Sequence, residues 1–308
     1  MPALIAQPGM PIWVDLATTD LDAAKAFYAG VLGWEFQQVS PMYALAKKDG
    51  MSVAGVAQVP KDNVSLWGMM LYTPNVADAH AKALEAGATS VLEPQDIKDG
   101  SSMAMIVDPC GATVGLKRPA DEIALFAAGE PSTPVWHELL VGAEWDKTLE
   151  FYHTLAGWDI RAMGGGSNGD AGASDSDASS SASSRYAVGE YDGAALVGMW
   201  DTSRMLTPDT LNTDATSAAG VPEATDASTV SMWTLYMGVG NLSEAIGKAL
   251  ELGGTLVREP WLSEFGRMAT IQDAQGALLN LCEVEEYVPS EDEVHEPDLF
   301  APEDFRAN

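Results

Sequence analysis

The sequence predicts an α+β protein made of two tandem copies of one domain. The motif at 11–16 (PIWVDL) returns at 134–139 (PVWHEL), and the Phe-Tyr and Gly-Trp pairs at 27–28 and 33–34 return at 151–152 and 157–158. Further echoes follow in the same order along the chain, which indicates a duplicated domain. The length of 308 residues also suits two domains, each large enough to bury a core.

The first half opens with one βαβββ pattern. Residues 11–17 alternate apolar and polar side chains, as a half-buried strand does. Thr19 or Asp20 then caps a helix whose apolar residues keep helical spacing until Gly33. Strands are expected at 34–39, 43–48 and 51–57, with Asp49-Gly50 as the hairpin turn between the last two.

The pattern then repeats within the same half. A strand is expected at 66–73, a helix from Asn75 to Gly87, and strands near 89–93, 102–107 and 112–117. The turn at 108–111 (DPCG) joins the last two strands, and 273–276 (DAQG) is its counterpart in the second half. Each half is therefore expected to be βαβββ-βαβββ.

Composition shifts give the domain boundaries. We expect a first domain at 1–122, a linker at 123–133, a second domain at 134–286 and an acidic tail at 287–308. The second domain carries two inserts, at 164–183 and 203–228, which are rich in Gly, Ser, Ala, Thr and Asp. Such segments have too few apolar residues to form a packed core, so they are expected to be loops.

The chain is strongly acidic, with a net charge of −29. Residues 283–308 alone hold ten acidic residues and one arginine, and no cluster of Lys and Arg offers a phosphate-binding surface. Nucleic acid is therefore not an expected partner. No apolar run approaches the roughly 20 residues of a membrane span, and Met1–Met10 does not look like a signal peptide, so we expect a cytoplasmic protein away from membranes. A monomer with pseudo-dimeric pairing of its domains and a homodimer are both consistent with the repeat.

These features together resemble the vicinal-oxygen-chelate superfamily, which includes glyoxalase I, bleomycin-resistance proteins and extradiol dioxygenases. The resemblance rests on the paired βαβββ modules, the Phe-Tyr and Gly-Trp pairs, and the Gly turn before the last strand. The P-x-W-x-[DNE]-L opening is similar to that of tandem two-domain glyoxalase/bleomycin-resistance-like proteins of actinobacteria. The resemblance implies that the eight strands of each domain curl into an open cup that holds a small molecule.

The resemblance also implies where a divalent metal would bind. Enzymes of this superfamily hold it with His, Gln or Glu from the first, fourth, fifth and eighth strands of a cup. In this chain those positions fall on Trp13, Gly55, Gly68 and Gly115, and on Trp136, Gly198, Thr234 and Asn280. Apart from the weak amide of Asn280, none is a normal donor for such an ion. No cofactor is therefore expected, although a displaced metal near Asp15, His137 or Glu138 remains an alternative.

Strand alternation selects the candidate site residues. Asp15 shares a face with Trp13, and Glu138 shares a face with Trp136, so all four are expected to line the cups. The tryptophans could stack on a planar ligand or simply fill the core. The carboxylates could act as a general base, anchor a ligand, or make a structural hydrogen bond. The predicted ligand-binding set is Trp13, Asp15, Trp136, Glu138, Tyr236 and Asn280, with Asp15 and Glu138 as catalytic candidates.

His137 lies on the opposite face of its strand and is expected to be a hydrogen-bonded structural residue. The leading functional hypothesis is a metal-free protein that binds a small organic molecule in one or both cups, for sequestration or detoxification. One alternative is a lyase, isomerase or dioxygenase with a displaced metal or cofactor-free acid–base chemistry. Another is an interaction module whose cups are filled by side chains.

Overall fold

The computed structural model describes residues 6–120, 129–163, 185–203, 231–263 and 265–285. Its strands form two sheets of eight, and the predicted α+β class with paired βαβββ modules is confirmed. The predicted tail, almost all of the two inserts and most of the linker lie outside the described residues.

The first sheet has the strand order β2-β3-β4-β1-β5-β8-β7-β6. Its two helices are α1 (Leu21–Leu32) and α2 (Val76–Glu85). The strands are β1 (Pro11–Thr18), β2 (Glu35–Ser40), β3 (Tyr43–Lys48), β4 (Met51–Gln58), β5 (Leu66–Tyr72), β6 (Thr89–Asp96), β7 (Ser102–Val107) and β8 (Thr113–Arg118).

The second sheet repeats this order as β10-β11-β12-β9-β13-β16-β15-β14. Its helices are α3 (Trp145–Ala156) and α5 (Leu242–Glu251). The strands are β9 (Pro134–Val141), β10 (Asp159–Met163), β11 (Tyr186–Tyr191), β12 (Ala194–Asp201), β13 (Met232–Val239), β14 (Thr255–Ser263), β15 (Gly266–Gln272) and β16 (Leu278–Glu283).

Local sequence signals set these boundaries. The Asp20 side chain accepts a hydrogen bond from the Ala23 amide and caps α1, and Gly33 ends that helix in the left-handed conformation. Asp49 and Gly50 both have positive φ, at 51° and 79°, as a two-residue hairpin turn that matches strand twist requires. The predicted caps and hairpin are therefore confirmed.

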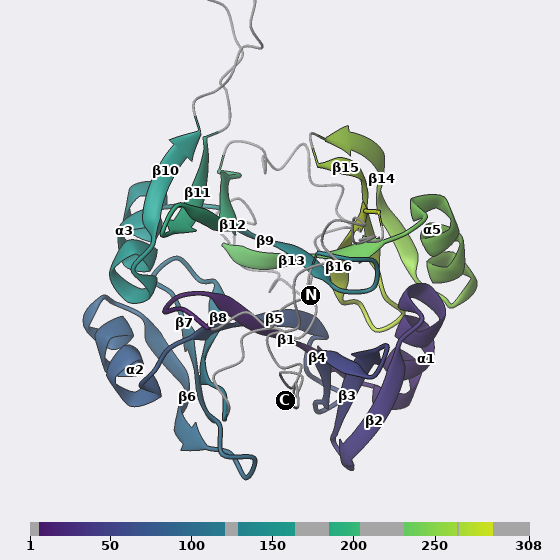
Figure 1. Cartoon of the computed structure of the whole chain (residues 1–308), viewed down its shortest axis with the longest axis horizontal. Helices are drawn as coiled ribbons and strands as arrows, with labels where there is room; N and C mark the ends of the chain where they lie inside the picture. The colour runs from purple at the N-terminus through teal and green to yellow at the C-terminus, as the bar shows by residue number, and fades with distance from the viewer. Residues whose placement is uncertain (1–5, 121–128, 164–184, 204–230, 264, 286–308) are drawn as a thin grey trace, which may run out of the picture.

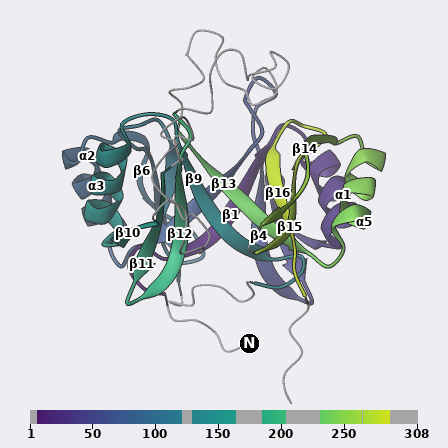
Figure 2. The same ribbon diagram turned by 90° about the horizontal axis from the view of Figure 1, so that it is seen from above.

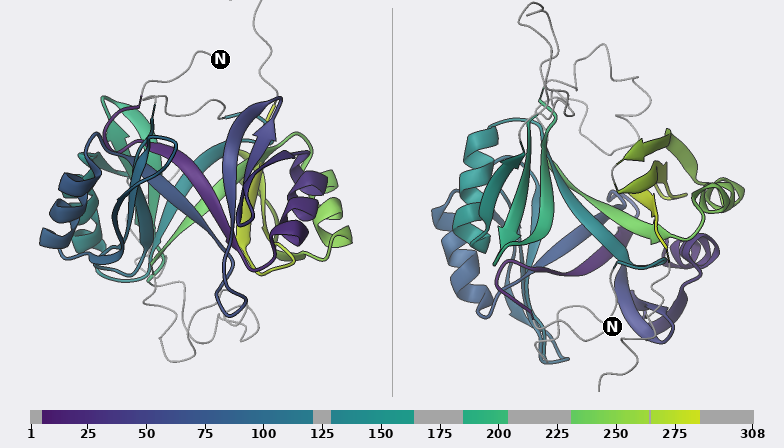
Figure 3. Two further views of the ribbon diagram at one scale, coloured as in Figure 1. Left: turned by 90° about the horizontal axis from the view of Figure 1, so that it is seen from below. Right: turned by 45° about the horizontal axis from the view of Figure 1, so that its top comes forward.

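The two sheets curve away from each other and lie back to back, so their concave faces open to opposite sides (Figure 1). Helices α1 and α5 lie side by side at one flank of the molecule, and α2 and α3 at the other (Figure 2). Figure 3 shows the first-domain sheet from below and the second-domain sheet with the top of the molecule tilted forward. Each helix thus pairs with a helix of the other domain, as in a pseudo-dimer.

The hydrophobic core is shared between the domains. One cluster joins residues of β1, α1 and β4, such as Leu16 and Phe27, to residues of β13 and α5, such as Met237. The other joins β5 and β7 to β9 and α3, for example Ile106 to Leu139. Because burying these side chains requires both domains, the apolar surface that stabilises each domain is completed by its neighbour.

Two buried tyrosines connect the domains through hydrogen bonds. Tyr28 donates to Asp273 Oδ2 at 3.0 Å and accepts a hydrogen bond from Trp67 Nε1 at 3.0 Å. In the mirrored arrangement, Tyr152 donates to Asp108 Oδ2 at 2.9 Å and accepts from Trp233 Nε1 at 2.9 Å. The Phe-Tyr pairs and the aspartate turns, which recur far apart in the sequence, therefore meet across the domain boundary.

The other oxygen of each aspartate holds its own turn. Asp273 Oδ1 accepts the backbone amides of Gln275 and Ala277, both at 2.9 Å, and Asp108 Oδ1 accepts those of Cys110 and Ala112. Burial raises the pKa of both carboxyl groups, and these hydrogen bonds partly offset the shift. The repeated turn is therefore a docking element as well as a strand connection.

Replacing Tyr28 by Phe should lower the free energy of unfolding by about 1–3 kcal/mol, because Asp273 loses a donor and Trp67 loses an acceptor in a buried setting. Guanidinium chloride denaturation measures the change. Tyr191→Phe is the matched control, since the Tyr191 hydroxyl makes no hydrogen bond to another described residue. Equal stability of the two variants would contradict the proposed importance of the Tyr28–Asp273 bond.

Candidate functional site

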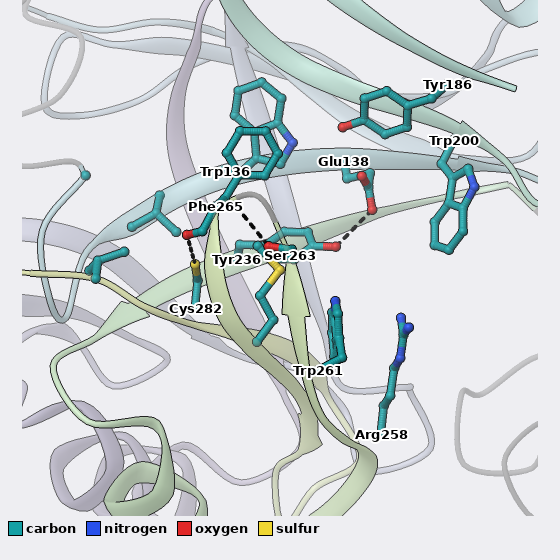
Figure 4. A pocket seen from close by; sticks show the side chains of 14 residues that line it. Trp136, Glu138, Tyr186, Trp200, Tyr236, Arg258, Trp261, Ser263, Phe265 and Cys282 are labelled. Atoms are coloured by element: carbon teal, nitrogen blue, oxygen red, sulfur yellow. Dashed lines mark hydrogen bonds between the residues drawn. The ribbon is translucent and has the colours of Figure 1, made fainter. Parts of the chain in front are cut away.

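The concave face of the second-domain sheet surrounds a cavity of about 490 Å³ (Figure 4). Residues from β9, β11, β12, β13, β14, β15 and β16 line it, so the whole curl of the sheet contributes. Most of the larger lining side chains are aromatic: Trp136, Tyr186, Trp200, Tyr236, Trp261 and Phe265. Aromatic walls with few polar groups are typical of sites for small organic ligands.

Glu138 is the acidic group of this cavity, and its side chain is almost completely buried, with 7% exposed. Tyr236 donates to Glu138 Oε2 at 2.9 Å, and Tyr186 lines the same cavity near the carboxylate. Burial raises the pKa of Glu138, while the two tyrosines and the charge of Arg258 oppose the shift. Burial and the neighbouring Glu138 charge raise the pKa of both tyrosines, which therefore remain protonated donors.

Arg258 brings a positive charge to the same cavity. Its guanidinium lies 3.8 Å from the centre of the Trp261 ring, and Figure 4 shows the two side chains next to each other across the cavity from Glu138. Such stacking holds a guanidinium in place without using its hydrogen-bond donors. Among the described residues, Arg258 has no ion-pair partner within 4.0 Å.

A smaller compartment of about 190 Å³ adjoins this cavity and shares Glu138, Tyr236, Arg258 and Trp261 with it. Its own polar lining comes from Ser65 of the first domain and from Thr234, Thr270 and Asn280 of the second. Asn280 Nδ2 donates to Thr234 Oγ1 at 3.0 Å, and Thr270 Oγ1 donates to Asn280 Oδ1 at 2.7 Å. The Asn280 amide is therefore held by two threonines of neighbouring strands.

The first-domain cup contains a related cluster. Asp15 Oδ1 accepts hydrogen bonds from Tyr43 at 2.8 Å and from Trp13 Nε1 at 3.1 Å. Lys117 Nζ lies 5.1 Å from the centre of the Trp13 ring. The pair Tyr43–Asp15 thus corresponds to Tyr186–Glu138, because Tyr43 and Tyr186 occupy matching places in the repeat.

The residues at the superfamily's metal positions do not fit a divalent ion. A side chain at Gly55 would overlap Asp15 and the Tyr43 hydroxyl, and one at Gly198 would overlap the Tyr186 hydroxyl. A side chain at Gly115 would overlap the sulfur of Met70. Other groups of the cups therefore occupy the space that ligand side chains need. In the described part of the chain, no three His, Cys, Asp or Glu residues lie close enough together to hold a metal.

The structure brings Trp136, Glu138 and Tyr236 together in one cavity and places Asn280 in the adjoining compartment. Trp13 and Asp15 lie in the other cup and contact each other. The roles of these six residues in binding or catalysis stay predictions.

Sequence reasoning missed four prominent lining residues: Tyr186, Trp200, Arg258 and Trp261. For Tyr186 a signal existed, since the spacing from Tyr43 to Gly55 is repeated from Tyr186 to Gly198. Arg258 and Trp261 gave none, because the register of β14 against β15 shifts on both sides of Arg258. Such irregularities interrupt the alternation of side chains between the two faces of a strand, so the sequence alone does not indicate which residues face the cup.

His137 differs from expectation. It is buried on the face of β9 opposite Glu138, and its Nδ1 has no hydrogen-bond partner in the described structure. The prediction of a fully hydrogen-bonded histidine is therefore wrong at this nitrogen. The cause is its setting: the directly opposite residue on β13 is Leu235, which offers no polar side chain. Burial lowers the pKa of His137 to about 4.

This shift predicts a pH-dependent stability. The unfolded histidine binds a proton near its ordinary pKa of 6.5, and the folded one only near 4. Stability from neutral His137 is thus present above pH 6.5 and is lost as the pH falls toward 4, by at most about 1.4 kcal/mol per pH unit. Replacing His137 by Val, the residue at the equivalent position 14, should reduce this slope in chemical denaturation. Parallel curves for both proteins would contradict the expectation.

Residues 11–116 match a family model described as "Glyoxalase/Bleomycin resistance protein/Dioxygenase superfamily". The second domain repeats the sequence motifs and the strand order of the first. The match to this superfamily therefore lies in the first domain of the chain.

Two curated relatives align over nearly their whole length. A Mycobacterium tuberculosis protein named "Putative glyoxylase CFP32" is 27% identical over 284 residues, covering 89% of this chain and 94% of the relative. The Streptomyces peucetius "Anthracycline biosynthesis protein DnrV" is 26% identical over 307 residues, covering 92% and 96%. Both alignments therefore extend over the two domains of this chain.

Solved structures support the fold. The Mn(II)-bound glyoxalase from Novosphingobium aromaticivorans gives a TM-score of 0.57 at 15% identity, covering 91% of this chain and 84% of that one. An extradiol ring-cleaving dioxygenase from B. fuscum gives 0.54 at 14% identity, covering 95% and 77%. At such identities the similarity shows the fold alone.

Within the described residues, no helix is long and apolar enough to cross a membrane.

Proposed function

We propose that the second-domain cup binds a planar aromatic small molecule without the help of a metal ion. The observation that carries the proposal is the 490 Å³ cavity lined by aromatic side chains on the concave face of the sheet. Its volume lies within the range of ordinary ligand sites, and its rings offer faces and edges on which a flat ligand can stack.

The polar groups suit orientation of such a ligand. Glu138 accepts hydrogen bonds at one wall, while Arg258 offers donors at another. A hydroxyl group of the ligand would donate to Glu138, and a carbonyl or anionic oxygen would accept from Arg258.

The presence of this cavity also argues against the alternative of an interaction module, in which side chains would fill both cups.

The relatives' names are compatible with this proposal. One is named for glyoxylase and the other for anthracycline biosynthesis, and anthracyclines contain fused aromatic rings. We carry over only the ligand class, a fused-ring aromatic compound. Sequestration or detoxification as the role, and a cytoplasmic location, stay predictions.

The binding proposal is testable with 1,8-dihydroxyanthraquinone as probe, by quenching of tryptophan fluorescence and by calorimetry. Trp136→Ala and Trp261→Ala should each weaken binding about tenfold or more, because a buried aromatic contact with the ring is lost. Leu262→Ala is the matched control, since Leu262 follows Trp261 on β14 and is 81% exposed. Unchanged affinity in both tryptophan variants would place the binding site elsewhere.

The metal-free part of the proposal has its own test. Protein purified without chelators should contain only substoichiometric Zn, Ni, Mn and Fe by elemental analysis, and EDTA should leave the melting temperature unchanged. The physical reason is that tyrosine hydroxyls and Met70 fill the space next to Gly55, Gly115 and Gly198. One metal ion per cup, or a lower melting temperature in EDTA, would refute it.

A further inference from the structure

Glu138 is the carboxyl group common to the two adjoining compartments of the second-domain cup. Among the described residues that line either compartment, no other Asp or Glu is present. Tyr236 donates a hydrogen bond to its Oε2, which fixes the orientation of the carboxylate. A carboxylate accepts about four hydrogen bonds, so this bond leaves positions for a ligand.

The surroundings of Glu138 make it a stronger base than an exposed carboxylate. Burial raises its pKa, although hydrogen bonds and Arg258 moderate the shift. A base with a raised pKa accepts a proton from a weak carbon acid more readily, while the anion is still populated at neutral pH.

Arg258 provides the complementary charge. The guanidinium is held against Trp261 and makes no ion pair with another described residue, so its donors remain available to a bound oxygen. It lies across the cavity from Glu138 (Figure 4). Although Arg258 is an exposed residue, a cation at this wall is suited to stabilise negative charge that develops on an oxygen during a reaction.

We propose that Glu138 is a general base that removes a proton from the benzylic carbon between an aromatic ring and the carbonyl group of a ketone, and that Arg258 stabilises the resulting enolate oxygen. This inference rests on the proposed function, because the cup must first bind the aromatic ring. The substrate class is a benzylic ketone, in which the carbon next to the carbonyl group is bonded to an aromatic ring, since conjugation of the enolate with the ring makes the C–H bond acidic enough for a carboxylate.

The proposed step balances without another reactant. The C–H bond breaks, and its proton moves to the Glu138 carboxylate. The C–H electron pair forms the C=C bond of the enolate, while the π pair of the carbonyl moves onto the oxygen that faces Arg258. Return of the proton to the same carbon regenerates the ketone, and return to another carbon of the conjugated system gives an isomer.

The experiment follows hydrogen–deuterium exchange at C1 of 2-tetralone in D₂O by proton NMR. The wild-type protein should accelerate exchange over buffer by about 100-fold or more, as expected for a positioned general base. Glu138→Gln should abolish the acceleration, Glu138→Asp should retain part of it, and Arg258→Met should reduce it about tenfold or more. Glu259→Gln is the control, because Glu259 is an exposed carboxylate next to Arg258.

Binding of 2-tetralone to each variant is measured in parallel by tryptophan fluorescence, and melting temperatures confirm that the variants fold. Acceleration that persists in Glu138→Gln would overturn the inference. Binding without acceleration in the wild type would overturn it while leaving the proposed function intact. Failure of both 2-tetralone and the anthraquinone probe to bind would overturn both proposals.

The exchange rate in the wild type should also increase with pH as Glu138 loses its proton. Because the pKa of Glu138 is raised, this increase should occur at higher pH than the titration of an exposed carboxylate. A pH-independent acceleration would exclude Glu138 as the base.

Discussion

The buried hydrogen bond from a tyrosine of one domain to the turn aspartate of the other is the constraint on which this architecture depends. Tyr28 reaches Asp273, and Tyr152 reaches Asp108, in a mirrored arrangement. Each aspartate also holds the backbone of its own turn. Because an unpaired buried carboxylate oxygen is costly, Oδ2 of each aspartate depends on the tyrosine from the helix of the other domain. The two sheets are thereby held back to back.

This arrangement keeps the concave faces free for ligands. The convex faces and helices supply the shared core, so residues inside the cups can change without loss of the main packing surface. The two cups have diverged in this way. The first holds Asp15 between Trp13 and Tyr43, whereas the second holds the longer Glu138 between Tyr186 and Tyr236 and adds Arg258. The second cup combines a large aromatic cavity with groups of both charges.

The same divergence accounts for the metal positions. Glycine stands at Gly55, Gly115 and Gly198, and in each case a neighbouring side chain occupies the space where a ligand residue would begin. The Tyr43 hydroxyl donates a hydrogen bond to Asp15 instead, and the Tyr186 hydroxyl lies in the cavity with Glu138. A tyrosine and a carboxylate thus lie beside the positions at which the superfamily resemblance implies a metal.

The sequence by itself determined the duplication, the order of strands and helices, and the inward face of β9, because repeats and side-chain periodicity are local signals. These signals were enough to select Trp136, Glu138 and Tyr236, which the structure brings together in one cavity. Only the tertiary structure decided that Tyr28 bonds an aspartate 245 residues away, and that Arg258 and Trp261 form the wall opposite Glu138. It alone left His137 Nδ1 without a described partner. Periodicity reports which face a residue occupies, whereas register shifts and the packing of distant elements decide what that face meets.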